Sequence, residues 1–133
     1  MSYLGPTSDP ARRRLIDLRQ VLIRLHKALL DSERNLYEKV HGPIGSAGQF
    51  LQLLIGDGWF AWLKPVTSLV AEIDETLTAR ERVRQDDFDR LFARAEKLFV
   101  PPDNGNGFTE HYRAAIQRDP EVAFLHAEVA RLL

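Results

Sequence analysis

The stretch that predicts the fold runs from residue 9 to residue 41 and reads DPARRRLIDLRQVLIRLHKALLDSERNLYEKVH. Asp9 and Pro10 mark a helix start, because aspartate caps backbone N–H groups and proline suits the first helical position. Leucines then recur at alternating steps of three and four residues, which is the a/d spacing of a helix seam. The next breaker is Gly42-Pro43. The leucine seam consists of Leu15, Leu18, Leu22, Leu25, Leu29 and Leu36, with Ser32 taking one turn in the series.

The predicted helix is long for its domain. About 32 residues at 1.5 Å each give roughly 48 Å, whereas a compact domain of this size has a diameter of about 36 Å. The helix therefore either bends or projects at one end. A leucine seam on a projecting helix most simply pairs with the same seam of a second copy. A homodimer is expected on this reasoning, and a seam folded inward within one chain is the alternative.

The rest of the chain also has the pattern of helices. Ser46 with Gln49 three residues later is a capping-box pattern ahead of an apolar run. Residues 56–58 interrupt that run, and Pro65 either kinks the following segment or begins the next helix. Further helices are predicted from an Asp86 N-cap, from Thr109 and from Asp119-Pro120. No strand-like alternation occurs, so an all-α bundle of about five or six helices with a long N-terminal helix is predicted.

Composition bounds the class of protein. The chain has 133 residues, of which 44% are hydrophobic and 28% charged, as in ordinary globular domains. We expect one domain over residues 1–133, with a flexible N-terminus at 1–8 and a mobile loop at 100–108. The absence of cysteine excludes disulfides, thiol catalysis and cysteine-based metal sites. No secretory signal and no apolar run of about 20 residues is evident, so a cytoplasmic protein without a membrane role is expected.

The segment between residues 56 and 65 reads GDGWFAWLKP, and it lies between the long helix and a Leu/Val/Ile helix that ends in Glu72-Ile73-Asp74-Glu75. It resembles a motif of short, uncharacterised bacterial helical proteins, and the similarity covers most of the chain. The resemblance implies a bacterial, cytosolic, helical protein. It implies no activity and no catalytic residues.

A metal or catalytic site has little support. Glu38 and His41 match the Glu-x-x-His spacing of di-iron bundles, but such a site needs that motif twice and two further glutamates. The histidines at 26 and 126 lie beside leucines of helical stripes, where we expect partly buried imidazoles with one hydrogen-bond partner each. No Ser/His/Asp arrangement is recognisable. No catalytic, metal-binding or cofactor-binding residue is therefore predicted, and no cofactor.

Two surfaces are candidates for interaction. Trp59, Phe60 and Trp62, next to Asp57, spread over more than half the circumference of a helix, so part of this aromatic surface must meet something beyond the local core. That neighbour is either another helix of the chain or a partner, because tryptophan is enriched at binding hot spots.

The second candidate is basic. Arg12, Arg13 and Arg14 crowd the first turns of the long helix, where the helix dipole disfavours cations. They are candidate anion contacts, as in a nucleic-acid binder. Against that interpretation stand the net charge of −1 and acidic residues that could pair with them, namely Asp86, Asp87 and Asp89.

Three hypotheses follow. The first is a homodimeric interaction or regulatory module without catalytic activity, whose partner is itself or another protein. The second is a helical bundle that binds a small molecule or a metal between its helices. The third is a nucleic-acid binder that uses the basic half of the long helix, where Arg19, Arg24 and Lys27 follow the three arginines; the near-neutral charge balance argues against it.

Overall fold

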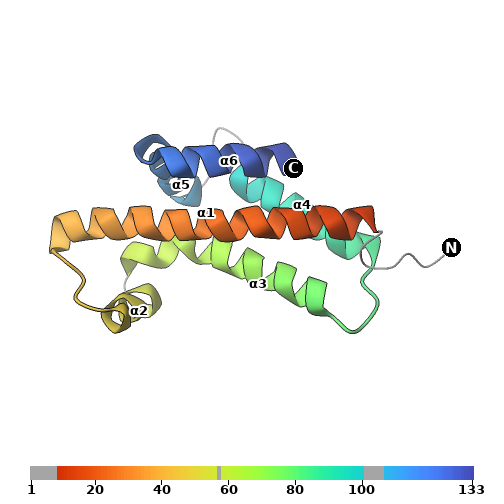
Figure 1. Cartoon of the computed structure of the whole chain (residues 1–133), viewed down its shortest axis with the longest axis horizontal. Coiled ribbons are helices and arrows are strands. Elements are labelled where there is room, and N and C mark those ends of the chain that lie inside the picture. The colour runs from red at the N-terminus through yellow and green to blue at the C-terminus, as the bar shows by residue number, and fades with distance from the viewer. Residues whose placement is uncertain (1–8, 57, 101–106) are drawn as a thin grey trace.

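The computed structural model describes residues 9–56, 58–100 and 107–133. Within these ranges the chain forms six α-helices, one 3₁₀-helix and no strand, so the predicted all-α bundle with a long N-terminal helix is confirmed. The elements are α1 (Pro10–His41), α2 (Ala47–Gly56), η1 (Gly58–Leu63), α3 (Lys64–Thr78), α4 (Gln85–Phe99), α5 (Gly107–Arg118) and α6 (Pro120–Leu132) (Figure 1).

Three of the sequence predictions fall partly or wholly outside the described residues. These are the flexible segment 1–8, the side chain of Asp57 and most of the predicted loop at 100–108. The end of that predicted loop is helix instead, because α5 begins at Gly107. Phe108 in its first turn is buried, being 7% exposed, and this packing explains why the segment is helical.

Helix α1 is the centre of the bundle. It packs against α3 on one side and against α5 and α6 on the other, with α4 also in contact (Figure 1). Its start is the predicted one, because Asp9 Oδ1 accepts hydrogen bonds from the N–H groups of Ala11 at 3.0 Å and Arg12 at 3.4 Å. It ends at Gly42, whose φ of 90° lies in the left-handed region that favours glycine.

The leucine seam lies inside the bundle. Five of its leucines are completely buried within one chain, namely Leu15, Leu18, Leu22, Leu25 and Leu29, each with 0% exposure. They form a single core with apolar residues of η1 and of α3 to α6. The expectation that this seam pairs with a second copy is therefore wrong for these five positions. Their burial is already satisfied by the other helices of the same chain.

The long helix projects at its C-terminal end. In Figure 1 this end of α1 runs on beyond α5 and α6. The seam ends there too, because Leu36 is only partly buried and Val40 is 62% exposed. Of the two ways to fit so long a helix into a small domain, projection is the one that the structure shows.

Two open points about helix boundaries are resolved. Pro65 lies in the first turn of α3 and so begins a helix. Asp86 is not the N-cap of α4, which begins at Gln85 with Arg84 as its N-cap. The carboxylate that caps this start belongs to Asp87, which accepts a hydrogen bond from the Arg84 N–H at 3.0 Å. Asp119 caps α6 as predicted.

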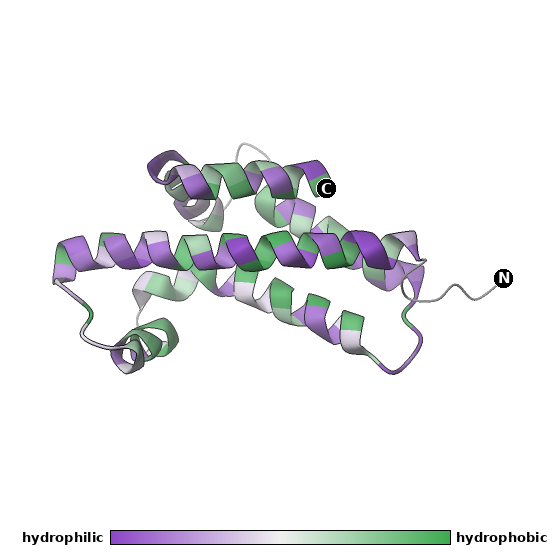
Figure 2. Cartoon of the chain, in the orientation of Figure 1, coloured by the Kyte–Doolittle hydropathy of each residue, from purple (hydrophilic) through white to green (hydrophobic). Residues whose placement is uncertain are grey.

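Helix α2 stands apart from the other helices. It packs mainly against η1, and none of its residues is buried. In Figure 2 it carries hydrophobic residues, in green, although it lies away from the bundle. Its start uses a variant of the predicted capping box, because Ser46 Oγ accepts from the Gln49 N–H at 3.1 Å while Gln49 Oε1 accepts from the Gly45 N–H at 2.8 Å. Among the described residues, no helix is long and apolar enough to cross a membrane.

Candidate interaction site

The three predicted aromatic residues occupy η1 and point to different neighbours. Trp59 lies edge-on to the rings of Tyr37 and His41 of α1, with centroid distances of 5.5 Å to each. Phe60 is buried, at 3% exposure, between α1 and α2. The aromatic residues nearest the projecting end of α1 are therefore held by the chain itself.

Trp62 belongs to another part of the structure. Its ring stacks on His111 of α5 with a centroid distance of 5.2 Å and an interplanar angle of 13°, and it contacts Phe108 at 5.6 Å. The structure thus does not bring the two tryptophans together into one patch. Trp59 packs η1 against α1, and Trp62 packs it against α5. Of the two neighbours considered for this aromatic cluster, these contacts are with other helices of the same chain.

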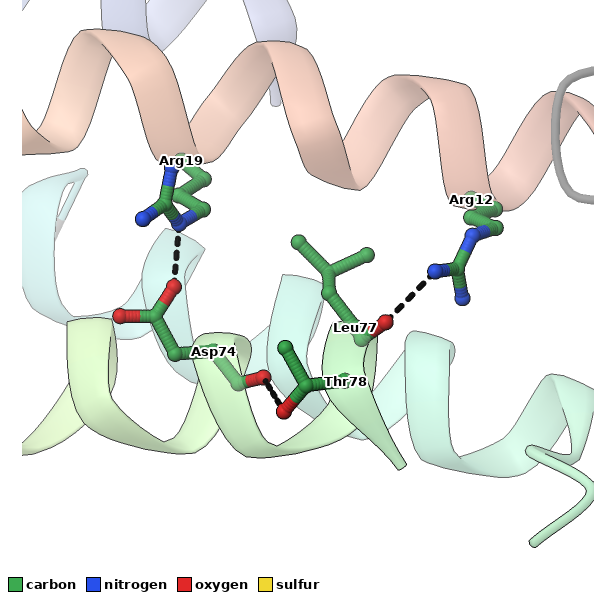
Figure 3. Close-up of polar contacts among 5 residues, drawn as sticks. All are labelled: Arg12, Arg19, Asp74, Leu77 and Thr78. Carbon is green, nitrogen blue, oxygen red and sulfur yellow. Dashed lines mark hydrogen bonds and ion pairs between the residues drawn. The ribbon is translucent and has the colours of Figure 1, made fainter. Parts of the chain in front are cut away.

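Of the candidate anion contacts, Arg12 is bound within the fold, whereas Arg13 is exposed. Arg12 Nη2 donates a hydrogen bond to the Leu77 carbonyl oxygen at 2.6 Å, in the last turn of α3 (Figure 3). This carbonyl is one of the groups that a helix leaves without an intrahelical partner at its C-terminus. Arg13 is exposed to solvent.

Arg14 contacts the end of α6 and the side of α4. Its Nε and Nη2 donate to the backbone oxygens of Leu132 at 3.0 Å and Leu133 at 3.1 Å. The guanidinium carbon also lies 4.1 Å from the centre of the Phe92 ring, which is a cation–π geometry. Arg12 and Arg14 therefore cap carbonyl groups of α3 and of the α6 end, and their donors serve the fold.

The acidic residues named as partners for this basic stretch pair elsewhere. Asp87 lies 3.6 Å from Arg90, and Asp89 accepts from the Gln85 side chain at 3.0 Å, both within α4. Asp86 is exposed on the same helix. Two other acidic residues pair with the first half of α1: Asp74 of α3 binds Arg19 (Figure 3), and Glu128 of α6 lies 3.6 Å from Arg24. Within one chain, Asp86, Asp87 and Asp89 therefore do not pair with Arg12, Arg13 or Arg14, because the carboxylates that reach α1 come from α3 and α6.

A buried ion pair escaped the sequence reasoning altogether. The Glu33 side chain is 6% exposed, and its Oε2 accepts a hydrogen bond from Arg118 Nη2 of α5 at 3.0 Å. Arg118 Nε also donates to Ser32 Oγ at 3.1 Å. The residues lie 85 positions apart or more. A sequence signal for this pair was Ser32, a polar residue at a position of the leucine seam. Since this position is buried, at 5% exposure, the serine needs a polar partner from another helix.

The two histidines are placed as predicted. The ring of His26 lies 3.0 Å from Thr67 Oγ1, and His126 Nδ1 lies 2.8 Å from the Tyr112 hydroxyl. Partial burial lowers the pKa of both imidazoles, because desolvation disfavours their charged form. Burial raises the pKa of Tyr112 for the same physical reason. Each histidine thus has one hydrogen-bond partner, which is a structural role.

Glu38 and His41 both contact other residues of the chain. Glu38 Oε2 accepts from the Ile44 N–H at 2.8 Å, and its Oε1 lies 3.4 Å from Arg34. His41 stacks at a tilt on Tyr37, with 4.5 Å between ring centroids. In the described part of the chain, no group of three or more acidic or histidine side chains is placed to hold a metal ion.

One side of α2 exposes two large apolar side chains. Leu51 is 56% exposed and Ile55 is 79% exposed. They are four residues apart and so share a helix face. We call these two residues the α2 face. Sequence reasoning missed it, because an apolar helix is normally expected to be buried.

Another side of α2 borders a cleft. It lies between the projecting end of α1, the connection at 42–46 and α2, and has a volume of about 450 Å³. The lining residues are Tyr37, His41, Gly42, Pro43, Ile44, Gln49, Gln52, Leu53 and Gly56. The α2 face and this cleft together make the projecting end of α1 the best candidate for a functional site.

Comparison of the chain with protein-family models, curated proteins and solved structures finds no match.

Proposed function

We propose that the protein is a non-catalytic interaction module that forms a homodimer through the α2 face. The observation that carries the proposal is that α2 buries none of its residues although six of its ten residues are large apolar or alanine side chains. Water-exposed apolar side chains grouped on one helix face mark an interaction surface in soluble proteins. The leucine seam plays no part in this proposal, since it belongs to the core.

The charge pattern favours a second copy of the chain as the partner. Residues 42–56 contain no charged residue. In a two-fold dimer the same patch meets itself, so charges of one sign would face each other near the axis. An uncharged patch avoids this repulsion. A partner chosen by charge would need complementary charges that this surface does not have.

The energetics predict a weak dimer. Full burial of a leucine or isoleucine side chain contributes about 1.5–3 kcal/mol. Scaled by the exposures of 56% and 79%, Leu51 and Ile55 contribute about 3 kcal/mol per copy and about 6 kcal/mol per dimer. Association costs about 4–15 kcal/mol in lost translational and rotational freedom. The partly buried apolar neighbours on α2 must therefore contribute as well, and we expect a dissociation constant on the order of micromolar or weaker.

The test is the solution mass of Ile55→Lys, measured by light scattering at several concentrations and two salt levels. We expect the unmodified chain to dimerise with rising concentration and the variant to stay monomeric. Ile23→Lys is the control, because Ile23 is also an exposed isoleucine, at 40% against 79% for Ile55, but it lies in the middle of α1. A monomer at every concentration would refute the homodimer. If Ile55→Lys dimerises with the affinity of the unmodified chain, the α2 face is not the dimer interface.

A further inference from the structure

The described residues that line the cleft beside α2 carry no fixed charge. They include no lysine, arginine, aspartate or glutamate. The nearby carboxylate of Glu38 is occupied by the Ile44 N–H and by Arg34. A charged ligand would lose its hydration here without gaining a counter-charge, which is unfavourable. The occupant that this lining suits is uncharged.

The cleft is also open. Most of its lining residues are exposed, including His41, Pro43, Gln49 and Gln52. Small-molecule sites enclose about 70–90% of their ligand, which an open cleft on the surface does not do. An extended chain that lies along the surface does not need such enclosure. The open form therefore favours an extended peptide as the occupant.

One wall of the cleft is aromatic and firmly held. The rings of Tyr37 and His41 lie 4.5 Å apart, and Trp59 packs its edge against both of them. Phe60 supports Tyr37 from the core side, with 5.6 Å between centroids. A fixed aromatic wall of this kind packs well against the flat, rigid rings of proline, as in the aromatic-lined grooves that bind proline-rich segments.

The opposite wall offers hydrogen-bond donors. Gln49 Oε1 already accepts from the Gly45 N–H at 2.8 Å, so its orientation is fixed and its amide nitrogen is left to donate. The side chain of Gln52, one helical turn further, makes no hydrogen bond to another residue that the structure describes. A polyproline II segment has no internal hydrogen bonds, so its carbonyl oxygens are free to accept from such donors.

The dimensions agree with this occupant. From Gln49 to Gly56 the α2 wall is about 10 Å long, at 1.5 Å per residue. One turn of polyproline II is three residues and about 9 Å long. We propose that the cleft between the end of α1 and α2 binds one turn of a proline-rich segment of a partner protein. The proposal does not depend on dimerisation, because Leu51 and Ile55 lie on another side of α2.

The test is fluorescence polarisation of a labelled decaproline peptide titrated with the full chain. A Gly/Ser peptide of the same length is the control probe, because it is equally uncharged but lacks rigid rings. We expect saturable binding of decaproline alone. Gln52→Ala should weaken it roughly fivefold through loss of one hydrogen bond, and His41→Ala should weaken it through loss of part of the aromatic wall. Gln20→Ala, an exposed glutamine of α1, is the matched control and should have no effect.

Three outcomes would overturn the proposal. They are no saturable binding of decaproline, equal binding of the Gly/Ser peptide, and binding that neither Gln52→Ala nor His41→Ala weakens. The Ile55→Lys variant separates this proposal from the homodimer. Binding of decaproline by that monomeric variant supports the cleft whatever the oligomeric state, whereas its loss would contradict an independent site.

Discussion

Arg12 offers the sharpest test of how the basic turn of α1 is used. Replacing Arg12 with alanine removes the hydrogen bond from its Nη2 to the Leu77 carbonyl oxygen, 2.6 Å long and partly buried. A hydrogen bond from a charged donor contributes about 1.5–3 kcal/mol. A cation at the C-terminal end of α3 adds about 0.3–1 kcal/mol, and a cation near the start of α1 opposes it by a similar amount. We therefore expect Arg12→Ala to lower the free energy of unfolding by about 2 kcal/mol.

The neighbouring residue provides the control. Arg13 is exposed, so Arg13→Ala should change the free energy of unfolding by no more than about 0.5 kcal/mol. The measurement is urea denaturation of both variants, followed by far-ultraviolet circular dichroism. Equal losses in the two variants would refute the assignment of Arg12 as a structural cap. A negligible loss in Arg12→Ala would do the same.

Two further predictions concern buried polar groups. Arg118→Ala leaves the Glu33 carboxylate without its ion-pair partner; because Arg118 is itself 30% exposed, we expect a loss of about 3 kcal/mol, at the low end for buried pairs. Replacing both residues with leucine and methionine should recover most of it, and a loss below about 1 kcal/mol in calorimetry of the single variant would contradict the pairing. Burial holds the pKa of His126 below its ordinary 6.5, so the unfolded chain takes up the proton first as the pH falls. The contribution of His126 to the free energy of unfolding should therefore decrease as the pH drops from about 6.5 through the folded-state pKa, and it should be constant above about pH 6.5. His126→Asn should reduce this slope in a pH series of urea denaturations, and an unchanged slope would exclude His126 as its source.

The helices could be predicted well from the sequence, but what covers them could not. The alternating spacing of Leu15 to Leu29 identifies a buried stripe on α1, and Asp9-Pro10 locates its start. The same spacing fits a dimer seam and a core position within one chain, because both need an apolar stripe along one side of a helix. Only the placement of α3, α4 and α6 distinguishes them. The resemblance to short bacterial helical proteins stays a prediction.

The candidate site was predictable only in part. The sequence singled out Trp59 and Phe60, which do lie at the projecting end of α1, but it grouped them with Trp62, which meets α5. The acceptors of Arg12 and Arg14 are backbone carbonyls, and a carbonyl has no signature in the sequence. The exposure of α2 could not be predicted either, because the apolar composition of this helix is typical of a buried one.

The caps on the first turns of α1 have a consequence for how the chain folds. Arg12 and Arg14 bind groups that follow 65 and 118 positions later. Contacts so distant in the sequence form late, because closing long loops costs conformational entropy before the contacts can compensate for it. We therefore expect slower folding than for a bundle that joins only consecutive helices. During synthesis, the leucines of α1 are not fully covered until α6 has been made, and we expect the growing chain to be most prone to aggregation before that point.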